Sequence, residues 1–226
     1  MHDNASLTHR GAARFLIGLA ALCLAGPALA GPGEKTEQKG EAAKVEKKME
    51  RVLGAANQAE EERKALRHFQ EDVTEYAEFH AEELAKLGPR AETVAVQKAL
   101  ADAIEAKRAK ARQGDIFRPE VQPLFRRRIA EQLAGPDARD ARRTILEGNS
   151  EDEKGEGSVP VEVRVNAAYP PGASRSTVPP SVLLTLPPLP ACLHYRFVDR
   201  DLILIDSVAG LIVDFLPAAA PDLAIK

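Results

Sequence analysis

The stretch LHYRFVDRDLILIDSVAGLIVDFL, residues 193–216, decides the fold of this 226-residue chain. It holds apolar runs separated by short polar turns. In the first run Leu193, Tyr195 and Phe197 alternate with polar residues, which is typical of a strand with one buried face. Turns this short connect neighbouring antiparallel strands. The stretch therefore predicts a small antiparallel β-meander with strands at 193–198, 202–206 and 211–216.

The sequence that precedes the meander, over residues 169–190, is rich in proline. Val161, Val163 and Val165 alternate with charged residues, so we expect a further strand there. One short helical turn is expected around residues 181–184. An acidic Gly/Ser stretch over residues 151–158 has the composition of a linker. We therefore expect residues 159–226 to form a proline-rich small β unit.

Two short helices are expected over residues 114–150. An apolar residue recurs at every fourth position of the first, which predicts a helix with one apolar face; these residues are Val121, Phe125, Ile129 and Leu133. Residues 137–147 are expected to form the second helix. Because a meander of this size needs cover for its apolar face, the first helix is the nearest candidate to supply it.

Residues 41–113 have the composition of a long helical hairpin. Alanine and charged residues of both signs dominate them, and these are strong helix formers. The sequence Leu87-Gly88-Pro89 predicts the end of the first helix, since glycine suits the left-handed cap and proline cannot continue the helix. A second helix is expected over residues 91–112, antiparallel to the first.

The apolar residues of the first helix repeat with a period near 3.5, which favours an exposed helix or a weak coiled coil. Val45, Met49 and Val52 begin this stripe. The same register places Arg63, Gln70 and His80 on it, so the stripe is narrow and interrupted. We therefore expect a helical arm rather than a wall of the core.

The first thirty residues have the pattern of an export signal. Arg10 and Arg14 precede a short apolar run, and small residues lead to Ala30. The run is shorter than the roughly 20 residues that span a bilayer. We expect cleavage after Ala30, a periplasmic protein, and a disordered lead over residues 31–40.

The fold class predicted from these signals is α+β. The predicted parts are a signal peptide (1–30), a disordered lead (31–40), a helical hairpin arm (41–113), a short-helix pair (114–150), a linker (151–158) and a small β unit (159–226).

Composition excludes several classes of function. Lys and Arg number 31 against 34 Asp and Glu, for a formal net charge of −3, whereas a nucleic-acid binder needs a basic excess. Aromatic residues make up only 4% of the chain, so stacking platforms are not expected. We expect no nucleic-acid partner, no cofactor and no metal site.

Candidate catalytic groups have structural interpretations. Cys192, the only thiol left after cleavage, and His194 would share a strand face, but no orienting group accompanies them. The carboxylates near the end of the chain suit turn and strand-edge roles; they are Asp199, Asp201, Asp206 and Asp214. His68 and Asp72, one helical turn apart, suit an exposed ion pair. We therefore predict no catalytic residue.

Basic clusters on the two short helices are the candidate contact residues. They are Arg126, Arg127, Arg128, Arg142 and Arg143. They suit the solvated side of amphipathic helices, and the functional alternative is contact with an anionic envelope surface or an acidic protein.

The end of the chain, LPPLPACLHYRFVDRDLILIDSVAGLIVDFLP, resembles the carboxy-terminal unit of the RcnB-like family of exported bacterial proteins. The matching elements are Leu189-Pro190, Tyr195-Arg196, the turn at 199–201, Leu204-Ile205-Asp206 and Gly210-Leu211-Ile212-Val213. The resemblance implies a periplasmic protein linked to nickel or cobalt homeostasis. This chain departs from that implication because it offers few metal-binding side chains.

These observations predict an exported periplasmic protein without enzymatic activity, which acts as an interaction or envelope-associated accessory. Its helical arm would contact a protein partner or a second copy. The alternative is an RcnB-like accessory of nickel or cobalt homeostasis.

Overall fold

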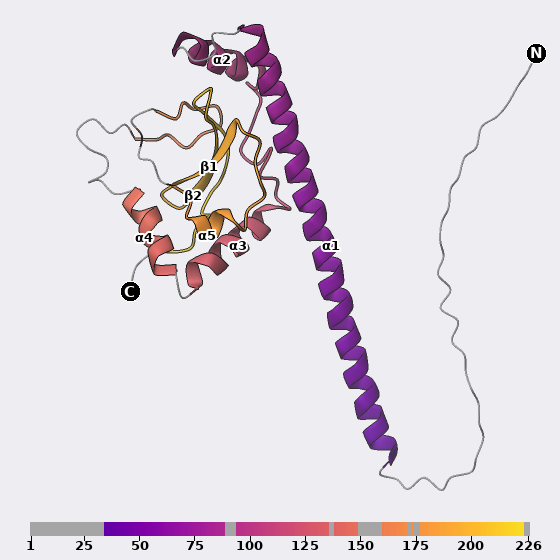
Figure 1. The fold of residues 1–226 in the computed structure, drawn as a ribbon. Helices are drawn as coiled ribbons and strands as arrows, with labels where there is room; N and C mark the ends of the chain where they lie inside the picture. The colour runs from indigo at the N-terminus through magenta and orange to yellow at the C-terminus, as the bar shows by residue number, and fades with distance from the viewer. Residues whose placement is uncertain are drawn as a thin grey trace, which may run out of the picture. The chain divides into compact units, whose positions relative to one another are not determined.

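The computed structural model describes residues 34–88, 94–135, 138–148, 160–170, 173 and 177–223, with side chains from residue 44 onward. Helices precede a carboxy-terminal antiparallel sheet, so the fold is α+β as predicted (Figure 1). The expected signal peptide and linker lie outside the described residues. No helix in the described part of the chain is both long and apolar enough to cross a membrane.

The helices and strands of the described residues are α1 (Glu34–Lys86), α2 (Val94–Lys107), α3 (Gln122–Ala134), α4 (Ala138–Gly148), α5 (Pro180–Leu183), β1 (Leu193–Val198), β2 (Asp201–Asp206) and β3 (Leu211–Leu216). The predicted strand bounds agree with these to within one residue. The short-helix pair and the helical turn near residue 182 are also confirmed.

The chain divides into two units, Met1–Arg51 and Val52–Lys226. In the first unit the described residues are helical from Glu34 onward, and the side chains of residues 44–51 are exposed. Helix therefore occupies residues 34–40, which were expected to belong to a disordered lead. Their Glu, Lys and Gln residues are good helix formers, and the single glycine at position 40 does not end the helix.

The sheet has the strand order β1-β2-β3 and is antiparallel throughout. Tyr195 lies opposite Leu204 in the first pair, and Ile203 lies opposite Phe215 in the second. A β-bulge between Leu204 and Ile205 shifts the register of β2 against β3. This is the predicted meander.

One face of the sheet belongs to the main core. This cluster includes Phe69 and Val73 of α1, Phe125 and Ile129 of α3, and Tyr195, Phe197 and Leu204 of the sheet. The Phe69 and Phe125 rings lie with centroids 5.0 Å apart. Helices α3, α4 and α5 pack against one another and are grouped together in Figure 1. The helix predicted to cover the meander does so, together with α1.

The opposite face of the sheet is covered by irregular chain. Ile203, Ile205 and Ile212 form its core, and Val161 and Val163 pack against them. The strand predicted over residues 161–165 is wrong: only an isolated bridge joins Ala168 to Leu211. The alternating valines cover the face of the sheet instead of lengthening it.

The buried stripe of α1 differs from the predicted one. Its members are Ala65, Phe69, Val73, Tyr76, His80 and Glu83. Only Val73 and His80 belonged to the predicted register, and Arg63 is exposed. This part of α1 is therefore a wall of the core, because Phe69 and Tyr76 bring large apolar areas to the interface.

Helix α1 ends where the sequence predicts. Gly88 has a φ of 79°, the left-handed conformation that favours glycine. Leu100 and Ile104 of α2 then pack against Ala209 and Leu211 at the start of β3. Helix α2 therefore covers the β2–β3 turn and belongs to the same unit as the sheet.

Candidate functional site

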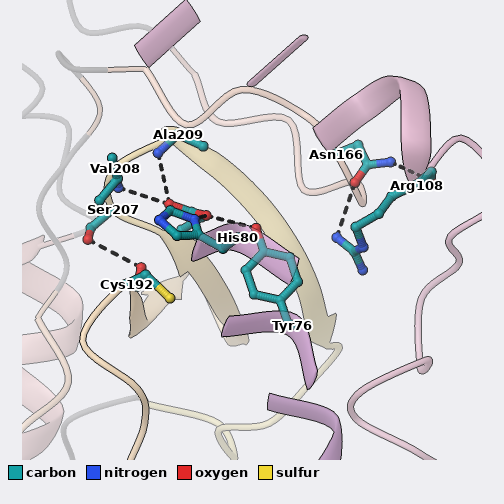
Figure 2. Close-up of polar contacts among 9 residues, drawn as sticks. Tyr76, His80, Arg108, Asn166, Cys192, Ser207, Val208 and Ala209 are labelled. Atoms are coloured by element: carbon teal, nitrogen blue, oxygen red, sulfur yellow. Dashed lines mark hydrogen bonds and ion pairs between the residues drawn. The ribbon is translucent and has the colours of Figure 1, made fainter. Parts of the chain in front are cut away.

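Asp206, at the end of β2, is the centre of a buried polar cluster that joins α1 to the sheet (Figure 2). His80 Nδ1 donates to Asp206 Oδ2 over 2.5 Å, and the Tyr76 hydroxyl donates to the same oxygen over 2.8 Å. The other oxygen accepts the backbone N–H groups of Val208 and Ala209. Every hydrogen-bonding direction of this fully buried carboxylate is therefore used.

The contacts of Asp206 stabilise its ionised form. Burial raises the pKa of this carboxyl. The contacts that lower the pKa outweigh burial: they are the hydrogen bond from His80, the Ala209 N–H, the charge interaction with His80 and the hydrogen bond from Tyr76. The net pKa lies below the ordinary value. Burial and the Asp206 carboxylate raise the pKa of Tyr76, so this phenol stays protonated as a donor.

The three side chains come from distant parts of the sequence. Tyr76 and His80 are one turn apart on α1 and so project from the same side of the helix. Asp206 ends β2 and accepts backbone N–H groups of the following turn, as predicted, but its burial and its contacts with Tyr76 and His80 were not predicted. Its place directly before the Ser207-Val208-Ala209-Gly210 turn was a usable signal, because Asp there caps backbone N–H groups.

Arg108 extends the polar cluster past Tyr76. Its guanidinium lies 5.1 Å from the centre of the Tyr76 ring and donates to Val213 O and Asn166 Oδ1. Asn166 donates back to Arg108 O and has a φ of 62°. Burial lowers the pKa of Arg108, and the carboxylates of Asp206 and Asp214 oppose that change. Arg108 thus balances negative charge within the unit.

Asp214 of β3 is a second buried carboxylate with a structural task. It accepts the backbone N–H groups of Gly114, Ile116, Phe117 and Phe215 at 2.7–2.9 Å. Burial raises its pKa, and these bonds only partly offset the rise. Asp214 is therefore buried and does not have a solvated strand-edge role: it fixes the loop that leads into α3.

A cavity of about 320 Å³ lies beside this network. Its lining includes Tyr76, Arg108 and Lys107 together with Asp72 and Glu75. Asp72 is bound to Arg118, and Lys107 is bound to Glu83. Asp72 and Lys107 are therefore engaged with side chains outside the cavity lining.

A histidine held by a buried carboxylate is also the geometry of a general base. Such chemistry needs a nucleophile bonded to the histidine. Within the described residues His80 has no hydrogen bond to Cys192 or Ser207, although Figure 2 draws both nearby. Burial and the Asp206 carboxylate raise the pKa of the Cys192 thiol, so this thiol is not activated.

Cys192 and His194, which were expected to share a strand face, have different surroundings. Cys192 is free and half-buried, precedes β1 and packs against the main core, whereas His194 is exposed. The predicted ion pair of His68 with Asp72 is wrong. Asp72 makes a bidentate pair with Arg118, while His68 Nδ1 lies 3.6 Å from Glu120. Loop residues outside α1 compete better for both side chains.

Metal ligands do not converge in the part of the chain that the structure describes. No group of three or more His, Cys, Asp or Glu side chains there lies close enough to hold an ion. His80, His68 and His194 each have a different environment.

The arginines predicted for partner contact all have intramolecular neighbours. Arg126 donates to Pro217 O and Arg128 to Thr185 O, so both tie α3 to distant segments. Arg127 pairs with Glu62 and Arg143 with Asp140, and Arg142 donates to Ala138 O. Arg127 and Arg143 are the exposed members. Their role in partner contact stays a prediction.

No protein-family model matches this chain, and neither a curated protein nor a solved structure matches it.

Proposed function

We propose that this protein is an exported accessory of the cell envelope that acts by contact rather than by catalysis. The observation that carries the proposal is an exposed segment of α1, residues 44–58, in which every side chain is exposed. Four large apolar side chains there are 59–61% exposed: Val45, Met49, Val52 and Leu53. Apolar exposure of this kind is typical of a helix that binds another surface.

The spacing of these residues supports a contact surface. Val45, Met49 and Val52 follow one another at steps of four and three, so a helix places them along one side. Charged residues flank them. The exposed side chains at these positions contribute little to the stability of the protein. A partner helix would cover the apolar stripe.

The later part of α1 packs in the core, in contrast to the exposed residues 44–58. From Ala65 to Glu83 one side of the helix is buried in the core, and the Asp206 network binds it at Tyr76 and His80. Export is supported by the sequence of residues 1–30, and the arginine clusters of α3 and α4 suit an anionic envelope surface.

The proposal is tested with full-length protein, because deleting α1 would remove core residues. Size-exclusion chromatography with light scattering and affinity purification from the native envelope are run on V45Q/M49Q/V52Q. The matched control, K44Q/K47Q/R51Q, changes the same number of side chains on other sides of the helix.

The apolar-to-Gln variant should lose self-association or the recovered partner while its thermal unfolding stays unchanged. The control should keep both. A wild-type chain that is monomeric and recovers the same proteins as the apolar-to-Gln variant would refute the proposal.

The alternative function, a nickel or cobalt accessory, rests on the resemblance of the chain's ending. Calorimetric titration with nickel, cobalt, copper and zinc tests it directly. Binding tighter than millimolar would favour the alternative over contact alone, and weaker binding would remove it.

A further inference from the structure

Among the described residues, no further strand pairs with the outer side of β1. The sheet order makes β1 an edge strand. Ser207 N–H donates to Cys192 O. Because hydrogen-bonded and non-hydrogen-bonded pairs alternate along an antiparallel ladder, the backbone groups of residues 194, 196 and 198 bond to β2. The N–H and C=O of Tyr195 therefore point away from the sheet, and within the described residues they have no backbone partner.

A groove of about 610 Å³ runs along this edge. Its walls come from β1 at Leu193–Arg196 and from the proline-rich segment that includes Leu186–Ala191. Four consecutive residues of β1 line it. Because consecutive strand residues point to opposite faces, the groove follows the edge of the sheet and not one face.

The prolines of the groove wall satisfy only part of the edge. Proline has no N–H to donate, and the contacts that join this segment to β1 use other groups. The Tyr195 hydroxyl donates to Pro187 O, and Leu193 N–H donates to Pro190 O within the turn. The outward groups of Tyr195 remain for another chain.

The ionisable side chains that the groove shares with β1 include Arg196 and His194, and neither is acidic. Arg196 is half-buried and His194 exposed. Both stand on one face of β1, opposite Ile203 and Ile205. In the part of the chain that the structure describes, neither is joined to a carboxylate. Leu193 and Tyr195 lie on the other face of β1, and both are buried.

We propose that β1 binds an extended peptide of a partner protein as a fourth, antiparallel strand, with acidic side chains facing Arg196 and apolar side chains facing the proline-lined wall. Strand addition uses the outward backbone groups for affinity and alternate side-chain positions for specificity. A second copy of β1 fits poorly, because its own Arg196 and His194 would face the same basic residues.

The phase of β1 makes the proposal specific. The backbone N–H and C=O of Arg196 bond to β2, so the peptide residue opposite Arg196 directs its own N–H and C=O away from β1. The peptide residue opposite Tyr195 directs these groups toward β1 and forms the hydrogen bonds. In a peptide that alternates valine and glutamate, the glutamates face Arg196. The valine amides then carry the hydrogen bonds to β1.

Fluorescence anisotropy with the full-length protein tests this. The probe is a labelled seven-residue peptide of alternating valine and glutamate. A labelled peptide of alternating valine and lysine is the control. The glutamate peptide should bind at least about tenfold more tightly. N-methylation of its valine amides should abolish binding, whereas N-methylation of its glutamate amides should leave binding nearly intact.

The variant Arg196→Glu should reverse the preference between the two peptides, while Arg139→Glu on the exposed side of α4 should leave it unchanged. Circular dichroism checks that each variant is folded. Equal binding of both peptides, equal effects of the two methylation patterns, or no binding by wild-type protein would overturn the proposal. The methylation comparison decides the question even where Arg196→Glu does not fold.

Discussion

Two buried aspartates show how the same side chain is used differently. Asp206 accepts from a histidine, a tyrosine and two backbone N–H groups, and its pKa falls. Asp214 accepts four backbone N–H groups without a contacting cation, and burial raises its pKa. Asp206 therefore joins elements through hydrogen bonds to side chains of α1, whereas Asp214 shapes a loop.

Replacing Asp206 with Asn should lower the free energy of unfolding by about 3 kcal/mol, because the charge is lost while its buried donors remain. Denaturant unfolding measures the change. Tyr76→Phe should cost about 1.5 kcal/mol, since one bond to a charged acceptor is lost. Asp140→Asn, at an exposed ion pair, is the control and should have almost no effect. Equal values for Asp206→Asn and Asp140→Asn would contradict the network.

The lowered pKa of Asp206 makes the stability of the protein depend on pH. Its folded-state pKa lies below that of an unfolded carboxyl, about 3.9. Its stabilising contribution is therefore complete above that value and is lost as the pH falls through the folded-state pKa. The stability difference between wild type and Asp206→Asn should shrink as the pH falls below about 4. A difference that grows with acidity would show that the sign is wrong.

Cys192 should react slowly with alkylating agents at neutral pH. Burial and the Asp206 carboxylate raise its pKa, so little thiolate is present. Iodoacetamide labelling followed by mass spectrometry measures the rate against glutathione. A rate faster than that of glutathione would instead indicate an activated thiol and would favour an enzyme.

At the scale of elements, α1 combines two apolar stripes in one helix. Val52 lies about a quarter of a turn away from Phe69 when positions are projected along a helix of 3.6 residues per turn. The exposed apolar residues near the start of α1 are therefore not a simple extension of its buried side.

The element scale also shows how far the sequence predicts the structure. The strands of the meander followed from local alternation and turns, and the end of α1 followed from Gly88. The buried side of α1 did not, because a strict 3.5-residue repeat counted from Val45 drifts by about 20° per heptad from a straight helix. The Asp206 network could not be predicted, since it joins residues some 130 positions apart.

The two stripes predict unequal costs of truncation. Phe69→Ala should destabilise the protein by about 4 kcal/mol, since it empties a fully buried site. Val52→Ala should change stability by less than about 0.5 kcal/mol, because the side chain is exposed. Thermal and denaturant unfolding measure both. The reverse order would show that the buried side of α1 is assigned wrongly.

Two glycines provide a matched test of backbone conformation. Gly210 has a φ of 68°, and an added Cβ would lie 3.0 Å from Gln97 Nε2, so Gly210→Ala should cost at least about 1 kcal/mol. Gly54 lies within α1 with open space around its Cα, so Gly54→Ala should stabilise by about 0.5–1 kcal/mol. Unfolding midpoints of the two variants should therefore move in opposite directions. A shift in the same direction would contradict the turn geometry or the helix at Gly54.

At the scale of the molecule, the account assigns different tasks to different parts. The unit from Val52 onward supplies the core, the sheet and the network that holds α1. The exposed segment of α1 supplies the proposed contact, and the groove beside β1 supplies a separate peptide site. Because the two proposed surfaces share no residue, either can fail without the other.

Site-specific photocrosslinking in the native host cell tests the contact most directly. A photoreactive residue replaces Met49, in the apolar stripe, or Lys47, on another side of the same helix. The account predicts a discrete adduct from position 49, at the mass of a dimer or of one partner, and much less from position 47. Equal adducts from both positions, or none from position 49, would contradict the claim that this stripe is a binding surface.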